Sequence, residues 1–173
     1  FSILYRNLCK NSQVTLPELS IQYADFSKWQ NNFLEGPNRG RLLDYWKSKL
    51  EKDLPVLELP ADHTRPAVKS YHGDSVVHRI YGGTASGLQS MATQSGNTMF
   101  TLLLSAFYVL LYRYTGQEDI TVGTPIANRN RAEIEPLIGF FVNTIVLRTD
   151  LAGQPGFKEL LRRVKEKTLE AFT

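Results

Sequence analysis

The stretch that decides the fold is Ile138-Gly-Phe-Phe-Val-Asn-Thr-Ile-Val-Leu-Arg-Thr-Asp150, in the last quarter of a chain of 173 residues. β-Branched and aromatic residues dominate it, so it predicts the strongest strand of the protein. Side chains of a strand alternate between two faces. One face would carry Phe141, Asn143, Ile145 and Leu147, and the other Val142, Thr144, Val146 and Arg148. Asn143 and Arg148 therefore cannot serve one site unless a bulge intervenes.

Asn143 is a polar side chain in the middle of this apolar stretch. A buried amide without hydrogen-bond partners costs about 1–3 kcal/mol. Either backbone groups satisfy the side chain, which makes its role structural, or the side chain lines a ligand tunnel. The residues alone leave both interpretations open.

Helical periodicity and shorter strand patterns surround this stretch. Helices are predicted at the N-terminus, from Tyr23 to a stop at Gly36-Pro37, and over Arg41–Lys52, Thr84–Gly96 (capped by Thr84 or Ser86), Asn97–Tyr114 (ending at Gly116) and from Phe157 onward. Strands are predicted over Gly73–Tyr81 and Glu118–Thr124, and a loop over Pro125–Pro136. This order predicts a layered α/β (or α+β) half-domain, with helices packed on a mixed sheet.

Composition excludes several classes of function. A hydrophobic fraction of 42% with 21% charged residues describes a folded chain, and a net charge of +3 is too small for a nucleic-acid-binding surface. The longest apolar run, residues 99–112, is too short to span a membrane. A single cysteine, Cys9, cannot form an internal disulfide and favours a reducing, cytoplasmic compartment. The chain therefore predicts no partner among nucleic acids or membranes.

The residues also show no catalytic or metal-binding constellation. His63, His72 and His78 do not have the spacing of metal ligands, so no metal site is predicted. No nucleophile elbow or phosphate-binding glycine loop is present. The basic residues of the last helix alternate with glutamates and predict a solvated face. The chain begins and ends inside helical patterns, so we expect it to be part of a longer protein.

Four motifs, in order, carry a resemblance that covers nearly the whole chain. Tyr23-Ala-Asp-Phe-Ser-Lys-Trp29 resembles the YxDFAxW motif of the condensation domains of nonribosomal peptide synthetases. Leu57-Glu-Leu-Pro-Ala-Asp-His-Thr-Arg-Pro66 is similar to their LPxDxxRP passage, Gly123-Thr-Pro-Ile-Ala-Asn-Arg129 to their GxPxANR turn, and residues 138–148 to their (I/V)GxFVNTxxxR motif.

The resemblance implies the fold and chemistry of that family. Such domains resemble chloramphenicol acetyltransferase, with two α/β subdomains and the reaction centre in a tunnel between them. Residues 1–60 would form the end of the N-terminal subdomain and a connector, and residues 61–173 part of the C-terminal subdomain. Carrier proteins would bring an acyl donor and an amine acceptor on phosphopantetheine, and an amide bond would form. No cofactor would bind to this chain directly.

The resemblance also implies which residues matter. Its HHxxxDG motif, whose second histidine is the family's catalytic group, is absent from this sequence, so no catalytic residue is predicted and the fragment alone would be inactive. Asn143 would line the tunnel, and Arg148 and Arg129 would orient neighbouring groups or form salt bridges. Tyr23, Asp25 and Trp29 would be packing residues near the subdomain junction, and Gly139 and Phe141 would be structural residues of the last motif. The partners would be carrier proteins, an adjacent adenylation domain and the remainder of the condensation domain.

Two other functions remain open at this point. The chain could be a non-catalytic module that docks neighbouring domains, with its slightly basic surface meeting an acidic carrier protein. It could also belong to a stand-alone acyltransferase of the same superfamily that uses coenzyme A. An HHxxxDG motif in the parent protein would favour condensation, and a degenerate motif would favour docking.

Overall fold

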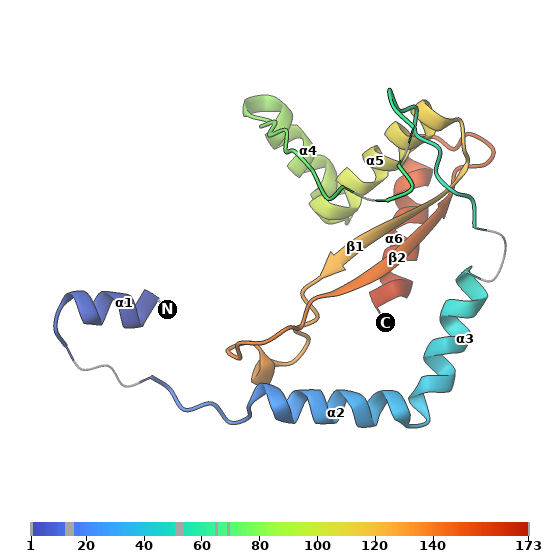
Figure 1. Ribbon diagram of the computed structural model, residues 1–173. Helices are drawn as coiled ribbons and strands as arrows, with labels where there is room; N and C mark the ends of the chain where they lie inside the picture. Colours follow the sequence, from blue (N-terminus) through green and yellow to red (C-terminus); the bar gives the residue numbers. More distant parts are fainter. Residues whose placement is uncertain (1, 13–15, 51–53, 65, 69, 173) are drawn as a thin grey trace. The chain divides into compact units, whose positions relative to one another are not determined.

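The computed structural model describes residues 2–12, 16–50, 54–64, 66–68 and 70–172 (Figure 1). Its helices are α1 (Ser2–Cys9), α2 (Tyr23–Glu35), α3 (Asn38–Leu50), α4 (Gly82–Gln94), α5 (Met99–Thr115) and α6 (Phe157–Phe172), with a 3-10 turn at Ala132–Ile134. Its strands are β1 (Asp119–Ile126) and β2 (Asn143–Asp150). The chain divides into two compact units. Unit 1 is Phe1–Trp46 with Ala127–Asn143, and unit 2 is Lys47–Ile126 with Thr144–Thr173.

Unit 1 is built around α2 and the segment between the two strands. The backbone N–H of Gln22 donates to the carboxylate of Asp25 at 2.8 Å, which caps the first turn of α2. The helix ends at Gly36, whose N–H bonds to the carbonyl of Asn32 at 3.1 Å. The buried core of the unit consists of Phe26, Ile134, Leu137 and Phe141, with Ile21 and Tyr23 packed against it.

Unit 2 is a layered arrangement of helices on a small sheet. β1 and β2 lie side by side and run in opposite directions (Figure 1). A bond from the N–H of Leu151 to the carbonyl of Glu118 extends the pairing. Helix α5 packs against β1, α4 and α6. Thr98 caps its start by accepting from the N–H of Thr101 at 3.1 Å, and Gly116 ends it at φ 69°, a conformation that favours glycine.

The layered half-domain predicted from the sequence is confirmed, and so are α5 with its Gly116 end, α6 and the stop of α2 at Gly36. Helix α3 begins at Asn38, three residues before the predicted start, and its predicted end lies outside the described residues. Strand β1 continues to Ile126, two residues into the predicted loop. The prediction that subdomains divide near residue 60 stays a prediction, since the two units are defined within this chain alone.

Three predicted boundaries or elements were wrong. Residues 73–81 form no strand, since no described segment pairs with them and Val76 and Val77 are 97% and 78% exposed. Strand β2 starts at Asn143 rather than Ile138 because Leu137 and Phe141 pack into the core of unit 1. Helix α4 starts at Gly82, and Ser86 lies inside it, where its hydroxyl donates to the carbonyls of Gly82 and Gly83 instead of capping.

Among the described residues, no single helix is long and apolar enough to cross a membrane. Helices α4 and α5 pass that test only as a pair, and they are bent by 107° at the break between them.

Candidate functional site

The residues singled out by sequence fall into two groups. Unit 1 contains Tyr23, Asp25, Trp29, Arg129, Gly139 and Phe141, with Asn143 at its last position, and unit 2 contains Arg148. The structure therefore brings most of the motif residues together in unit 1, although they come from opposite ends of the sequence.

Tyr23 links the start of α2 to the segment before β2 by a hydrogen bond and an aromatic contact. Its hydroxyl donates to the carbonyl of Phe140 at 3.0 Å, across 117 residues of sequence. Its ring meets Phe141 edge-on, with ring centroids 5.3 Å apart. A Cβ atom on Gly139 would lie only 2.2 Å from the ring of Tyr23, so glycine is required there by close approach. The Tyr of the first motif and the Gly of the last motif are thus one packing unit.

Arg129 forms hydrogen bonds within the loop between the two strands. Its guanidinium donates to the carbonyls of Ile134 and Glu135. The same group lies 4.0 Å above the centroid of the Phe141 ring. These contacts occupy Arg129 with its own loop and its own core, which makes it a residue that positions the backbone.

Trp29 and Asp25 complete the unit from α2. The Trp29 ring lies 5.9 Å from Phe26 and stacks on Phe33 at 5.4 Å. Trp29 is 40% exposed, and the guanidinium of Arg131 lies 4.5 Å from the centroid of its ring. Asp25 serves the cap of α2 described above. In this unit, both residues therefore act on packing and helix geometry.

Asn143 is the first residue of β2, and it is exposed. By strand alternation it lies on the same face as Ile145 and Leu147, which are buried. Asn143 lies at the end of the strand, where this face is no longer covered, so the residue is exposed to solvent. Exposure also removes the desolvation cost that a central position in the sheet would impose.

Arg148 joins three segments within unit 2. Its Nε atom donates to both carboxylate oxygens of Asp119 at 2.9 and 3.1 Å, and Nη1 donates to the backbone carbonyl of Lys49 at 3.0 Å. The hydrogen bond to Asp119 is the main cause that raises the pKa of Arg148. Asp119 lies on β1 and Lys49 near the end of α3, so Arg148 ties both to β2.

Sequence reasoning missed Asp119 and the carbonyl of Lys49 as partners of Arg148. Antiparallel pairing of the predicted strands could have placed Asp119 opposite this part of β2. The contact to Lys49 joins residues 99 apart in sequence, and no sequence signal points to it.

Tyr108 is the largest fully buried side chain among the described residues, and sequence reasoning did not single it out. Its hydroxyl donates to the carbonyl of Leu147 at 2.8 Å and so fastens α5 to β2. Burial raises the pKa of Tyr108 to about 12. A group that stays protonated in this way supports the sheet and offers no base near neutral pH.

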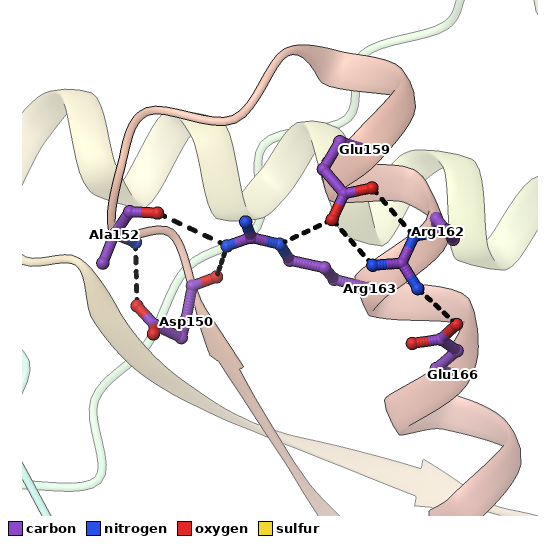
Figure 2. A network of polar contacts seen from close by, with 6 residues as sticks. All are labelled: Asp150, Ala152, Glu159, Arg162, Arg163 and Glu166. Carbon is purple, nitrogen blue, oxygen red and sulfur yellow. Dashed lines mark hydrogen bonds and ion pairs between the residues drawn. The ribbon is translucent and has the colours of Figure 1, made fainter.

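A network of ion pairs covers the start of α6 (Figure 2). Arg162 bonds to Glu159 and Glu166, and Arg163 bonds to Glu159. Arg163 also donates to the carbonyls of Asp150 and Ala152, which fixes the turn after β2. The hydrogen bond from Arg162, followed by that from Arg163, lowers the pKa of Glu159 to about 2. Every charge in this network is matched, as expected for a solvated helix face.

A pocket of about 380 Å³ lies in unit 2 between α5, the turn after β2 and α6. Its lining is Val109, Tyr112, Arg113, Leu151, Gln154, Pro155 and Leu160. None of the residues singled out by sequence lines it. Among the described residues, no group of three or more His, Cys, Asp or Glu side chains is placed to hold a metal ion.

Comparisons with known proteins agree on one family. The family model described as "Condensation domain" matches residues 1–173. A linear gramicidin synthase subunit of Brevibacillus parabrevis is 49% identical over 169 residues, and chondramide synthase cmdD of Chondromyces crocatus is 48% identical over 171 residues. These stretches cover 98% and 99% of this chain. The chain spans only 3% and 4% of the length of these relatives.

Solved structures give the same result. The X-domain from teicoplanin biosynthesis matches with a TM-score of 0.85 and 28% identity, over 98% of this chain and 39% of that chain. SgcC5 from Streptomyces globisporus matches with a TM-score of 0.81 and 29% identity, over 98% of this chain and 38% of that one. This chain therefore corresponds to less than half of each of those folded proteins.

Proposed function

Because this chain belongs to the condensation-domain family, we propose that it is the supporting part of a nonribosomal peptide synthetase domain that joins a carrier-bound acyl donor to a carrier-bound amine. The observation that carries the proposal is the 49% identity to the linear gramicidin synthase relative across 98% of this chain. A match of that length spans all four motifs, including the residues that pack Tyr23 against Gly139.

The reaction forms one bond and breaks another. The nitrogen of the acceptor amine attacks the carbonyl carbon of the donor thioester, so a carbon–nitrogen bond forms and the carbon–sulfur bond breaks. The sulfur leaves as the thiol of phosphopantetheine and accounts for the proton that the amine loses. The second histidine of HHxxxDG would assist this step, and that motif is not in this sequence.

Asn143 is the residue of this chain that we place against the substrate. Its exposed amide can donate to a carbonyl oxygen or accept from an amine. Arg129 and Arg148 would not contact the substrate themselves, because their guanidinium groups bind backbone carbonyls or the Asp119 carboxylate. They position the loop before β2 and the strand itself. Carrier proteins and an adenylation domain would be neighbours in the cytoplasmic synthetase, and the carriers would supply phosphopantetheine.

A chimera tests the proposal. This chain replaces the aligned 169 residues of the condensation domain in the linear gramicidin synthase relative, and amide product between two loaded carriers is measured. We expect product from the chimera and none when the second histidine of the host motif is changed to Ala. Folded chimera that binds carriers but makes no product would contradict the proposal.

The role of Asn143 is tested in the same chimera. Asn143→Ala should lower the rate of amide formation by about tenfold or more, because one hydrogen bond to the transition state is lost. Glu133→Ala, at an exposed position of the 3-10 turn Ala132–Ile134 in unit 1, is the matched control and should leave the rate unchanged. An unchanged rate with Asn143→Ala would contradict a contact with the substrate and would favour a structural role for this residue.

A docking module is the second candidate. It is favoured by the likeness to the X-domain solved as a complex with OxyB from teicoplanin biosynthesis, at a TM-score of 0.84 and 27% identity. A chimera that binds neighbouring proteins without forming amide would support this candidate.

A further inference from the structure

Residues 54–60, which follow α3 in the sequence, belong to unit 2 but have little that could hold them there by burial. We call them the connecting segment. Its two prolines, Pro55 and Pro60, have no N–H to donate, and the segment is neither helix nor strand. Leu54, Val56 and Leu59 are 42%, 74% and 50% exposed. Apolar contacts therefore stabilise the position of this segment only weakly.

The side chain of Gln117 binds the backbone of the connecting segment on both sides of Leu57. Its Nε2 donates to the carbonyl of Val56 at 2.9 Å, and its Oε1 accepts from the N–H of Glu58 at 2.9 Å. A residue of a parallel strand binds its neighbouring strand in the same way, with one bond on each side of the residue opposite. Glutamine can replace such a strand residue because its amide carries both a donor and an acceptor.

Gln117 is itself held by the residues around it. Its backbone N–H donates to the hydroxyl of Thr115 at 3.1 Å, and that hydroxyl donates to the carbonyl of Leu111 in the last turns of α5 at 2.9 Å. The carbonyl of the next residue, Glu118, accepts from the N–H of Leu151 at 2.8 Å. The backbone of Gln117 is thus fixed between the end of α5 and the start of β1, and its amide is positioned for the segment.

The end of α3 is also attached to unit 2. The carbonyl of Lys49 accepts from Nη1 of Arg148 on β2 at 3.0 Å, and Nζ of Lys49 pairs with Glu170 on α6 at 2.7 Å. The chain is therefore bound to unit 2 at Lys49, before residues 51–53, and again at Val56 and Glu58, after them.

We infer that Gln117 is a positioning residue: its amide takes the place of a neighbouring strand and fixes the connecting segment, and with it the start of the passage at Leu57, to unit 2. Because both hydrogen bonds go to backbone atoms, the side chain of Val56 should be replaceable, whereas that of Gln117 should not. The segment that the sequence predicts as a connector between subdomains is then an attached part of unit 2. This inference goes beyond the proposed function and does not depend on amide formation.

Hydrogen exchange of the Glu58 amide, measured by NMR in the 173-residue chain, tests the inference. Gln117→Met keeps the length of the side chain and removes both hydrogen bonds, so the amide of Glu58 should exchange at least tenfold faster. Gln117→Glu keeps only the acceptor and should give an intermediate rate. The midpoint of urea denaturation should stay close to the native value, because both bonds are exposed and hold one segment.

Two controls separate the amide of Gln117 from other effects. Gln89→Met makes the same change at an exposed position of α4 and should leave the exchange of Glu58 as in the native chain. Val56→Ala removes an exposed side chain without touching the backbone bonds, and it should also leave this exchange rate unchanged.

Thermolysin cleavage covers the case of a chain that does not fold alone. It is carried out in the chimera with the linear gramicidin synthase relative, whose aligned residues include both partners of the contact. Cleavage between Val56 and Leu57, identified by mass spectrometry, should be at least tenfold faster with Gln117→Met than in the native chimera or with Gln89→Met.

Three outcomes would overturn the inference. Native exchange and cleavage rates in Gln117→Met would show that the amide does not hold the segment. Faster exchange throughout unit 2, with a lowered denaturation midpoint, would show a general loss of stability instead of a local release. The same acceleration with Gln89→Met would show that the effect is not specific to position 117. Because no arm measures amide product, an inactive chimera does not affect the result.

Discussion

At the scale of single residues, Gly139 is the glycine at which an added side chain would be most crowded. A Cβ atom there would lie 2.2 Å from Cδ2 of Tyr23, well inside contact distance. Gly139→Ala should lower the free energy of unfolding of unit 1 by about 2 kcal/mol or more, because the Tyr23 ring must move. Both tryptophans, Trp29 and Trp46, belong to this unit, so denaturation followed by tryptophan fluorescence measures it.

Gly40→Ala is the matched control for that experiment. Gly40 lies in α3, where a Cβ atom would have nothing within 4 Å, and its backbone is helical. Alanine there should stabilise the chain by up to about 1 kcal/mol through the unfolded state. Equal effects of the two substitutions would contradict the close packing of Gly139 on Tyr23.

Tyr108 makes stability depend on alkaline pH. Its pKa is about 12 in the folded chain against an ordinary value of 10.0, so between these values the unfolded chain loses a proton that the folded chain keeps. Stability from this group is present below pH 10 and is lost as the pH rises toward 12. Between pH 9 and pH 11 the loss should be about 1.3 kcal/mol, the free energy of one pKa unit. Urea denaturation at pH 9 and pH 11, followed by circular dichroism, measures it.

Tyr108→Phe separates this effect from the titration of other groups. The variant should be about 1 kcal/mol less stable at pH 9, because the buried carbonyl of Leu147 loses its partner. Its decline between pH 9 and pH 11 should be smaller than that of the native chain. A decline of the same size would show that Tyr108 is not the group responsible.

At the scale of elements, Arg148 links β2 to β1 through Asp119 and to α3 through the carbonyl of Lys49. Arg148→Gln should lower the free energy of unfolding by about 1–2 kcal/mol, because charge-assisted bonds are lost from a partly exposed pair. Asp119→Asn alone should cost less, since the contact to Lys49 remains. The double variant should be less destabilised than the sum of the two, as measured by urea denaturation. Additive losses would contradict the pair.

Sequence patterns predicted elements well where the local signal agreed with the tertiary packing. Helix α5 has an N-cap at Thr98 and a left-handed glycine at Gly116, so both of its ends are set by local chemistry. Strand β2 was predicted five residues too early, because residues 138–142 have strand composition but Phe141 among them packs on Phe26 of α2 in unit 1. A strand exists only with a partner, which explains why residues 73–81 did not form one.

The candidate site was predictable only in part, for a similar reason. The motifs identified Arg129 and Arg148 as candidate residues. They did not identify the carbonyls and the carboxylate that these residues bind, because those partners come close only in the folded chain. Strand alternation placed Asn143 on the same face as the buried Ile145 and Leu147. Its exposure results from its position as the first residue of β2, and alternation alone does not predict where a strand begins. Tyr108 was hidden in a helix that is apolar throughout, where nothing in the pattern marks one aromatic residue as bonded to β2.

At the scale of the whole molecule, the net charge of +3 leads us to expect a modest electrostatic attraction to an acidic partner. Binding of the chimera to an acidic carrier protein should weaken by about three- to tenfold between 50 and 500 mM salt, because salt screens charges that are not buried. Titration calorimetry at both salt concentrations measures this change. A carrier with its surface acidic residues changed to neutral ones should bind independently of salt. Salt-independent binding of the acidic carrier would contradict an electrostatic contribution.

The discontinuity of unit 1 has a consequence for how the protein is made. Its helices leave the ribosome first, but the segment that supplies Phe141 and accepts the hydrogen bond of Tyr23 follows more than a hundred residues later. Closing so long a loop is slow compared with forming a helix. During synthesis, Phe26 of α2 remains without its core partners until β1 and the loop that follows it have left the ribosome. The order of residues along the chain thus leaves unit 1 incomplete until residue 143 has been made, although its helices are made first.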